Sequence, residues 1–283
     1  MDVADDGLFC GDPVGRWAEE KHALVSFYAK LFSTGMKDKW HERVYIELYS
    51  GSGHSRIRDT ARTIAGSPLL ALAVEHPFDK YIFCEMNSEA LDALRARVES
   101  AAPSAKVAYI KGDCNERVDD ILAEIPAYST GHRVLSLCFV DPFDIGIKFE
   151  TLSALSERFV DFLVLLALYM DANRNYENYV KEEAVKIDEF LGSRTWREEW
   201  KARQKEGVPF PQFLAEEFYT SMERLKYRPQ PFYKMKPVKI AEMNVALYRL
   251  ALFSRHSTAY AFWDQVLKYI TPQQAFEFED PLV

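Results

Sequence analysis

Short apolar segments alternate with amphipathic stretches through most of the first 170 residues, and this alternation sets the fold class. The apolar segments are residues 44–49, 81–85, 107–111, 134–140 and 159–169. Strands separated by helices form parallel sheets, and strands that are apolar along nearly their whole length are covered on both faces. The sequence therefore predicts an α/β protein with a mostly parallel sheet and helices on both faces.

The flanking segments complete this organisation. Residues 16–32 carry apolar side chains at helical spacing before the first strand, and Ser67-Pro68 has the pattern of an N-cap followed by proline at the first helical position. Charged helical stretches run from 171 to about 226, β character returns at 232–236 and 244–254, and a last helix is predicted at 259–270. We divide the chain into an N-terminal helical segment (1–40), a cofactor-binding core (41–170), a helical insertion suited to substrate recognition (171–230), and final strands and helix (231–283).

Composition excludes several classes of protein. The chain is 48% hydrophobic, enough for a sizeable core, and its net charge of −8 argues against non-specific coating of nucleic acid. The cysteines have neither CxxC nor zinc-like spacing, which fits free thiols in a reducing cytoplasm. The longest apolar run, 162–170, is about half of what a membrane-spanning helix needs, and the acidic N-terminus does not have the layout of a signal peptide. We expect a cytoplasmic protein with no metal site and no membrane contact.

A glycine-rich turn follows the first predicted strand, in the segment from Glu47 through Tyr49 to Gly51 and Gly53. Ligands of open α/β sheets bind beyond the carboxyl ends of the strands, and glycines allow a ligand to approach the backbone. The same pattern also serves as an ordinary tight turn between a strand and a helix.

Acidic side chains follow the next two strands. Glu85 is placed to accept hydrogen bonds from both hydroxyls of a ribose, and Asp113, next to Cys114, is placed to meet the exocyclic amine of adenine. Acids near helix N-termini are also common for local reasons. Their occurrence at successive strand ends favours an adenosine-containing ligand.

The motif around the turn separates the possible cofactors. A dinucleotide fingerprint requires a third glycine where Arg56 stands, and there is no P-loop motif. The order acid-x-aromatic-x-Gly-x-Gly instead resembles the S-adenosylmethionine motif of class I methyltransferases, in the version found among nucleic-acid amino-methyltransferases. This resemblance implies that Glu47 and the turn hold the methionine end, with Glu85 at the ribose and Asp113 at the adenine.

The fourth strand ends in Asp141-Pro142-Phe143, which resembles the (D/N/S)PP(Y/F) motif of amino-methyltransferases with its second proline absent. There the polar side chain and a backbone carbonyl hold the target amine while the aromatic ring stacks on the base. Methyl transfer mainly requires positioning. The alternative is a strand end at which proline stops the sheet.

Most of the chain resembles the three-Cys-motif partner protein (TcmP) family, a methyltransferase-like bacterial group. The resemblance rests on Trp17-x-x-x-Lys21, YIELYSGSG, Gly66-Ser67-Pro68, VDPF at 140–143, ALYMDANRN at 167–175 and LYRLALFSRHS at 247–257. It implies a Rossmann-like class I methyltransferase fold, with a mostly parallel seven-stranded sheet and a helical insertion before the last strands. It also implies a protein partner of radical-SAM type that carries the three-cysteine motif.

A basic and aromatic segment, 224–240, contains no acidic residue and offers a surface for nucleic acid, because cations pair with phosphates and aromatic rings stack on bases. Lysines also protect exposed sheet edges, so this segment has a second interpretation. The predicted substrate contacts are Lys234, Lys236, Lys239, Tyr233 and, after the fifth strand, Arg174.

These observations lead to three functional hypotheses. The first is transfer of a methyl group from S-adenosylmethionine to an amine of a nucleic acid, with Asp141-Pro142-Phe143 as the catalytic motif. The second is a non-catalytic scaffold that works with the radical-SAM-type partner. The third is an enzyme that acts on a small molecule or a protein side chain.

Overall fold

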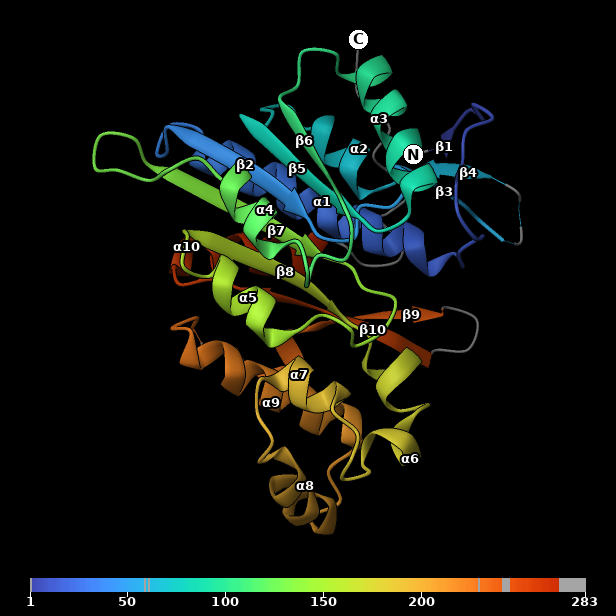
Figure 1. The fold of residues 1–283 in the computed structure, drawn as a ribbon, viewed down its shortest axis with the longest axis vertical. Coiled ribbons are helices and arrows are strands. Elements are labelled where there is room, and N and C mark those ends of the chain that lie inside the picture. The colour runs from blue at the N-terminus through green and yellow to red at the C-terminus, as the bar shows by residue number, and fades with distance from the viewer. Residues whose placement is uncertain (1, 59, 61, 229, 241–244, 270–283) are drawn as a thin grey trace.

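The computed structural model describes residues 2–58, 60, 62–228, 230–240 and 245–269. A seven-stranded sheet crosses the molecule in the order β6-β5-β2-β7-β8-β10-β9 (Figure 1). Its strands are β2 (Glu42–Glu47), β5 (Lys80–Glu85), β6 (Val107–Lys111), β7 (Val134–Val140), β8 (Val160–Leu166), β9 (Lys236–Ile240) and β10 (Val245–Phe253). The pairs β8–β10 and β10–β9 are antiparallel, and the other neighbouring pairs are parallel. This is the arrangement of the Rossmann-like class I methyltransferase fold, and the predicted fold class is confirmed.

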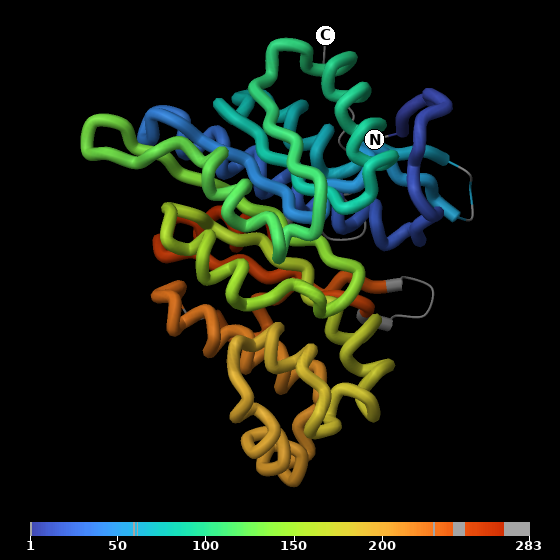
Figure 2. Tube along the Cα trace, in the orientation of Figure 1, coloured from blue at the N-terminus to red at the C-terminus, as the bar shows by residue number. Residues whose placement is uncertain are grey.

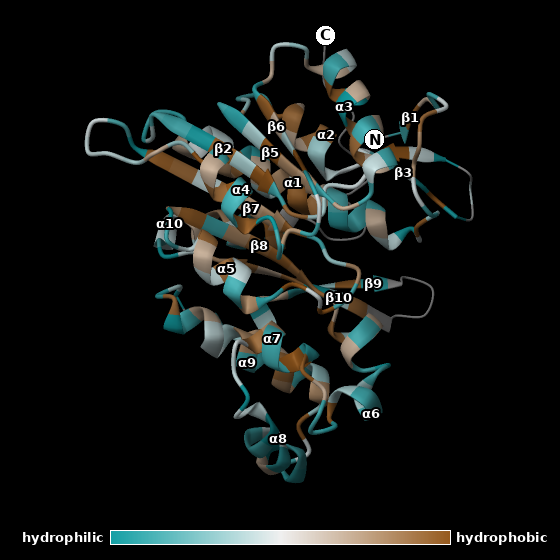
Figure 3. Ribbon diagram, viewed as in Figure 1, coloured by the Kyte–Doolittle hydropathy of each residue, from teal (hydrophilic) through white to brown (hydrophobic). Residues whose placement is uncertain are grey.

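Helices cover both faces of the sheet, as the uniformly apolar strands require. One face packs against α1 (Trp17–Met36), α2 (Ser67–Leu72), α3 (Ser88–Ala101) and α10 (Ser257–Tyr269). The other packs against α4 (Val118–Glu124), α5 (Phe149–Leu155), α7 (Lys186–Leu191), α8 (Trp196–Lys205) and α9 (Phe210–Arg224). Figure 3 shows β7 and β8, in the middle of the sheet, as largely hydrophobic, and α8, far from the sheet, as mainly hydrophilic.

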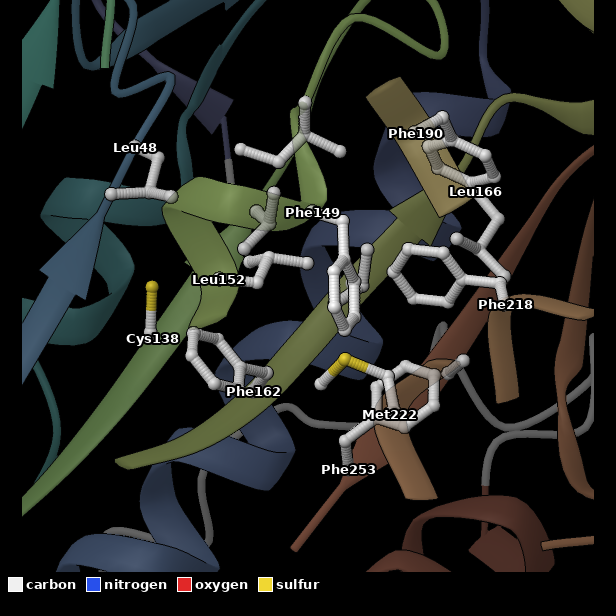
Figure 4. Packing of buried hydrophobic residues seen from close by; sticks show 14 of the residues in the cluster. Leu48, Cys138, Phe149, Leu152, Phe162, Leu166, Phe190, Phe218, Met222 and Phe253 are labelled. Atoms are coloured by element: carbon white, nitrogen blue, oxygen red, sulfur yellow. The ribbon is translucent and has the colours of Figure 1, made fainter. Parts of the chain in front are cut away.

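Helices α7, α8 and α9, which lie between β8 and β9 in the sequence, form one lobe on the second face (Figure 2). This lobe shares its core with the sheet: Phe190 of α7 and Phe218 of α9 stack with ring centroids 4.7 Å apart, next to Phe149 of α5 and Leu166 of β8 (Figure 4). The lobe therefore belongs to the layer that covers β8 and β10. No helix in the described ranges is both long enough and apolar enough to cross a membrane.

Three local features differ from the sequence predictions. The strand expected at 159–169 ends at Leu166, and a π-helical turn, η1 (Leu168–Ala172), and a short helix, α6 (Tyr176–Tyr179), follow it. Residues 232–234, predicted to have β character, instead form a 3₁₀ turn, η2 (Phe232–Lys234), and β9 begins only at Lys236. Pro231, directly before the turn, has its φ fixed at −69° by its ring.

The third difference is a second sheet, which no pattern predicted. It has the order β1-β4-β3 and consists of β1 (Asp2–Val3), β4 (Thr63–Ala65) and β3 (His54–Arg56). At the other end of the chain, the last residue of the helix predicted at 259–270 lies outside the described residues.

Candidate active site

The glycine turn after β2 needs glycine for two different reasons. Gly51 and Gly53 have φ angles of +60° and +82°, in the left-handed region that favours glycine. A Cβ at Gly53 would also lie 2.8 Å from the Cδ1 of Leu94, whereas a Cβ at Gly51 would have nothing within 4 Å. The backbone oxygen of Gly53 accepts a hydrogen bond from the Gly66 amide at 2.7 Å, which fixes the turn against the start of α2.

We expect Gly53→Ala to lower the free energy of unfolding by about 2–3 kcal/mol, because backbone strain and a steric clash add together. Gly51→Ala carries only the strain and should cost about 1 kcal/mol. Gly207→Ala is the control, since Gly207 has a φ of +79° in open space. Urea unfolding of the three variants measures these differences, and equal losses at Gly53 and Gly207 would show that the turn is not tightly packed.

Glu47 is the last residue of β2, directly before the segment that forms the turn, and it is fully buried. The Ser67 hydroxyl donates to its Oε1 at 2.5 Å and the Tyr45 hydroxyl donates to its Oε2 at 3.1 Å. Ser67 was predicted to be a helix N-cap, but Gly66 holds that position, and the Ser67 hydroxyl serves the buried carboxyl instead. Burial raises the pKa of Glu47 well above its ordinary value of 4.5.

Glu85 connects the end of β5 to the glycine turn. Its Oε2 accepts a hydrogen bond from the Gly51 amide and its Oε1 accepts one from the Asn87 amide, both at 2.8 Å. The side chain is half-buried, and a carboxylate can accept more than two hydrogen bonds. Glu85 can therefore hold the turn and accept the hydroxyls of a ribose at the same time.

The residues after β6 lie on the same side of the sheet. Asp113 is half-buried, and its Oδ1 accepts a hydrogen bond from the Asn115 amide at 2.9 Å. Cys114 is buried next to the Tyr49 hydroxyl, and burial raises the pKa of its thiol to about 12. Cys114 and Tyr49 pack against the core of the sheet, whereas Asp113 is not part of that core.

The residues present fit the cofactor that the motif implies. The Ser50 hydroxyl lies buried within the turn and has no hydrogen-bond partner in the structure. Buried polar groups usually have partners, so an unpaired hydroxyl at this position is suited to a polar ligand. The Ser50 hydroxyl, the carboxylates of Glu85 and Asp113, and the backbone of the glycine turn together offer hydrogen-bond donors and acceptors that suit S-adenosylmethionine.

Asp141 lies beyond the end of β7 and makes a close ion pair. The Nζ of Lys21, on α1, is 2.5 Å from its Oδ2, and both side chains are largely buried. Next to this pair, the Trp17 ring lies 5.4 Å from the ammonium of Lys21 and 4.9 Å from the ring of Tyr248. The ion pair joins two residues that are 120 positions apart in the sequence.

The predicted catalytic motif divides into a buried and an exposed part. Pro142 is buried, whereas Phe143 is 86% exposed. An exposed phenylalanine is unusual, and this ring is free to stack on a planar ligand.

Two polar residues that the sequence did not single out hold the loop after this motif. Asp171 of η1 accepts a hydrogen bond from the Ile145 amide at 3.0 Å, and is itself held by the Tyr179 hydroxyl at 2.8 Å. On the other side, Asn115 donates to the Gly146 oxygen at 3.0 Å and accepts from the Lys148 amide at 2.9 Å. Asp171 lies within the ALYMDANRN segment, but that pattern gave no indication of its role.

We expect Asp171→Ala to lower methyl transfer at least tenfold while the affinity for S-adenosylmethionine changes less than threefold. The change leaves buried donors without an acceptor and releases the loop that carries Phe143. Glu177→Ala, which removes an exposed acid on the neighbouring α6, is the control. Turnover and calorimetric titration of both variants test this positioning role, and unchanged turnover in Asp171→Ala would contradict it.

The basic and aromatic segment does not form one continuous surface. Tyr227 is buried and donates to the Val160 oxygen at 2.9 Å, and the ring of Phe232 is covered by Arg249. The prediction that the aromatic rings of this segment stack on bases is therefore wrong for Tyr227. Tyr233, by contrast, is 77% exposed.

The predicted cationic contacts have different surroundings. Lys234 pairs with Asp264, and Lys236 pairs with Glu20 at 3.3 Å, next to Lys21 in the sequence. Arg174 is exposed, and its charge opposes that of Asp141 in shifting the pKa of Tyr248, which burial raises to about 12. Lys239 lies further along β9 than Lys236, opposite Ala246 of β10.

Comparison with known proteins shows likeness in fold. Protein LPL1258 from Legionella pneumophila is 13% identical, with 92% of this chain and 94% of that chain covered and a TM-score of 0.51. Trm1 from Pyrococcus horikoshii, solved with S-adenosyl-L-methionine, is 11% identical over 95% of this chain and 64% of its own, with a TM-score of 0.44. TYW2 from M. jannaschii, in complex with AdoMet, is 11% identical over 90% and 86%, with a TM-score of 0.41. No family model and no curated protein matches the chain.

Proposed function

We propose that this protein is an S-adenosylmethionine-dependent methyltransferase that acts on an amine of a nucleic acid. The observation that carries this proposal is the position of Asp141 relative to the glycine turn. β2 and β7 are adjacent and parallel, and Glu47, the last residue of β2, lies opposite Phe139 of β7. Asp141 comes two residues after Phe139, so it lies beside the start of the turn that follows Glu47. The Asp141 carboxylate, which can accept a hydrogen bond from an amine, therefore lies close to the glycine turn, which we assign to the cofactor. Both lie at the carboxyl edge of the sheet, where α/β folds bind ligands.

Each residue has a definite part in this proposal. The backbone of the glycine turn holds the methionine end of the cofactor, Glu85 accepts the ribose hydroxyls, and Asp113 orients the adenine. When bound, S-adenosylmethionine supplies an electrophilic methyl group. Asp141 accepts a hydrogen bond from the target amine. This hydrogen bond positions the nitrogen lone pair of the amine, and such positioning provides most of the catalysis.

A nucleic-acid substrate is supported by the exposed ring of Phe143 next to Asp141. Base stacking on an aromatic side chain is a common feature of enzymes that act on a base outside its stack. Arg174, which follows η1 and is exposed, is a further cation that could neutralise phosphates of a bound strand.

The competing proposal is a non-catalytic, TcmP-like bacterial partner of a radical-SAM-type protein. Two observations favour it: Lys21 already occupies Oδ2 of Asp141, and the second proline of the motif is absent. In this proposal the fold is kept, while the ion pair closes the position of the target amine.

Turnover separates the two proposals. The purified chain is incubated with S-adenosylmethionine and a mixed pool of DNA and RNA, and release of S-adenosylhomocysteine is followed. The enzyme proposal predicts nucleic-acid-dependent release that nuclease treatment of the pool abolishes. Binding of the cofactor with no release on any pool would favour the scaffold.

A further inference from the structure

The ion pair between Lys21 and Asp141 changes what kind of amine can reach this site. An isolated carboxylate in a partly buried pocket attracts cations, because charges interact strongly away from bulk water. Here the Lys21 ammonium lies 2.5 Å from the carboxylate, and the two side chains are only 8% and 15% exposed. The charge of Asp141 is therefore already neutralised before any substrate arrives.

The position of Lys21 is built into α1. Trp17, one helical turn earlier, lies with its ring 5.4 Å from the Lys21 ammonium and packs against Tyr248 of β10. Lys21 reaches Asp141 from the sheet face that α1 covers, with its aliphatic stem buried. The ammonium is therefore held in place beside Asp141.

Two acids of the neighbouring elements α1 and β2, Glu20 and Glu47, already have partners of their own. Glu20 of α1 pairs with Lys236 of β9 at 3.3 Å, and Arg174, after η1, adds a positive charge near Tyr248. Glu47 is fully buried between the hydroxyls of Ser67 and Tyr45. A second ammonium group at Asp141 would have to lose its water beside a carboxylate that Lys21 already neutralises, which is strongly unfavourable.

We infer that Lys21 is a specificity-determining residue that restricts the target to an uncharged amine, such as the exocyclic amine of a nucleobase, and excludes alkylammonium groups. Lys21 contacts only Oδ2, and a carboxylate can accept a further hydrogen bond at its other oxygen. An uncharged aromatic amine donates that hydrogen bond without bringing a charge, and its ring meets the exposed face of Phe143. The inference rests on the proposed methyltransferase function and adds the charge of its substrate.

The chemistry agrees with this choice. The nitrogen lone pair of the target forms the new N–C bond as the C–S bond of the cofactor breaks, with the electron pair of that bond going to sulfur. The methylated nitrogen then loses one N–H proton to water. An uncharged amine has this lone pair at neutral pH, whereas an alkylammonium must first lose a proton.

The test compares two substrate pools with wild type and three variants. The first pool is total RNA, whose reacting amines are uncharged, and the second is spermidine with a lysine-containing peptide. Lys21→Gln keeps a hydrogen-bond donor for Asp141 without the charge, and Lys21→Arg keeps the charge. Lys30→Met is the matched control, since Lys30 is an exposed lysine of the same helix.

We expect the same preference in wild type, Lys21→Arg and Lys30→Met: release of S-adenosylhomocysteine at least 50 times faster with RNA than with the alkylamines. The reason is that a charged amine would remain unpaired at this site. Lys21→Gln should lower this ratio at least tenfold, with cofactor affinity and melting temperature measured alongside. A ratio unchanged in Lys21→Gln, or efficient use of alkylamines by wild type, would overturn the inference while the methyltransferase function stands. No release with either pool in any of the four proteins would overturn that function and the inference together.

Discussion

Asp141→Ala is expected to reduce methyl transfer at least 100-fold while the affinity for S-adenosylmethionine stays within about threefold of wild type. The change removes the acceptor that holds the target amine, and none of the cofactor contacts involves this side chain. It also leaves the Lys21 ammonium largely buried without its partner, so we expect a loss of about 1–3 kcal/mol in the free energy of unfolding.

Asp141→Asn separates these two effects. The amide keeps one oxygen acceptor at the same place and loses the charge, so some transfer should remain, at least ten times more than in Asp141→Ala. Asp119→Ala, which removes an exposed acid on α4, is the control for both. Cofactor turnover and calorimetry measure the outcome. Full activity in Asp141→Ala would remove Asp141 from the catalytic motif.

Glu47→Gln is expected to make the protein without cofactor more stable at pH 8, by about 1 kcal/mol. Burial raises the pKa of Glu47 above its ordinary value of 4.5, so the folded state binds this proton more tightly than the unfolded state. The free energy of unfolding of wild type therefore falls as pH rises above about 4.5 and continues to fall until the pKa of the folded state is passed. Glutamine has no proton to lose and keeps hydrogen-bonding groups for Ser67 and Tyr45.

The measurement is urea unfolding of wild type and Glu47→Gln from pH 5 to pH 8.5. The stability of the variant relative to wild type should increase across this range. Glu75→Gln, at a largely exposed glutamate, should follow wild type at every pH. Parallel curves for Glu47→Gln and wild type would show that Glu47 is ionised in the folded state as readily as in the unfolded chain.

The sheet could be predicted from the sequence because its strands are apolar and separated by helices. Each of the five predicted parallel strands overlaps one of β2, β5, β6, β7 and β8. The small sheet of β1, β3 and β4 was missed because its strands have two or three residues and little apolar pattern. The π-helical turn η1 was merged into β8 because an apolar run gives no sign of where extended backbone ends.

Local motifs indicated where the candidate site lies but not how its parts interact. The glycine turn, Glu85 and Asp141 are recognisable because each lies at or just after the end of a strand. The pairing of Lys21 with Asp141 joins residues 120 positions apart, and the burial of Glu47 depends on Ser67, which looked like a helix cap. Such contacts arise from the packing of α1 and α2 on the sheet, which short sequence patterns do not contain.

Calorimetric titration of the purified chain with S-adenosylmethionine tests the central claim most directly, with Glu85→Ala as the site variant and Glu89→Ala, at an exposed glutamate of α3, as its control. The account predicts binding with a Kd of about micromolar order for wild type and Glu89→Ala, and at least 30-fold weaker binding for Glu85→Ala. Absence of binding to folded wild type, or equal affinity in Glu85→Ala, would contradict it.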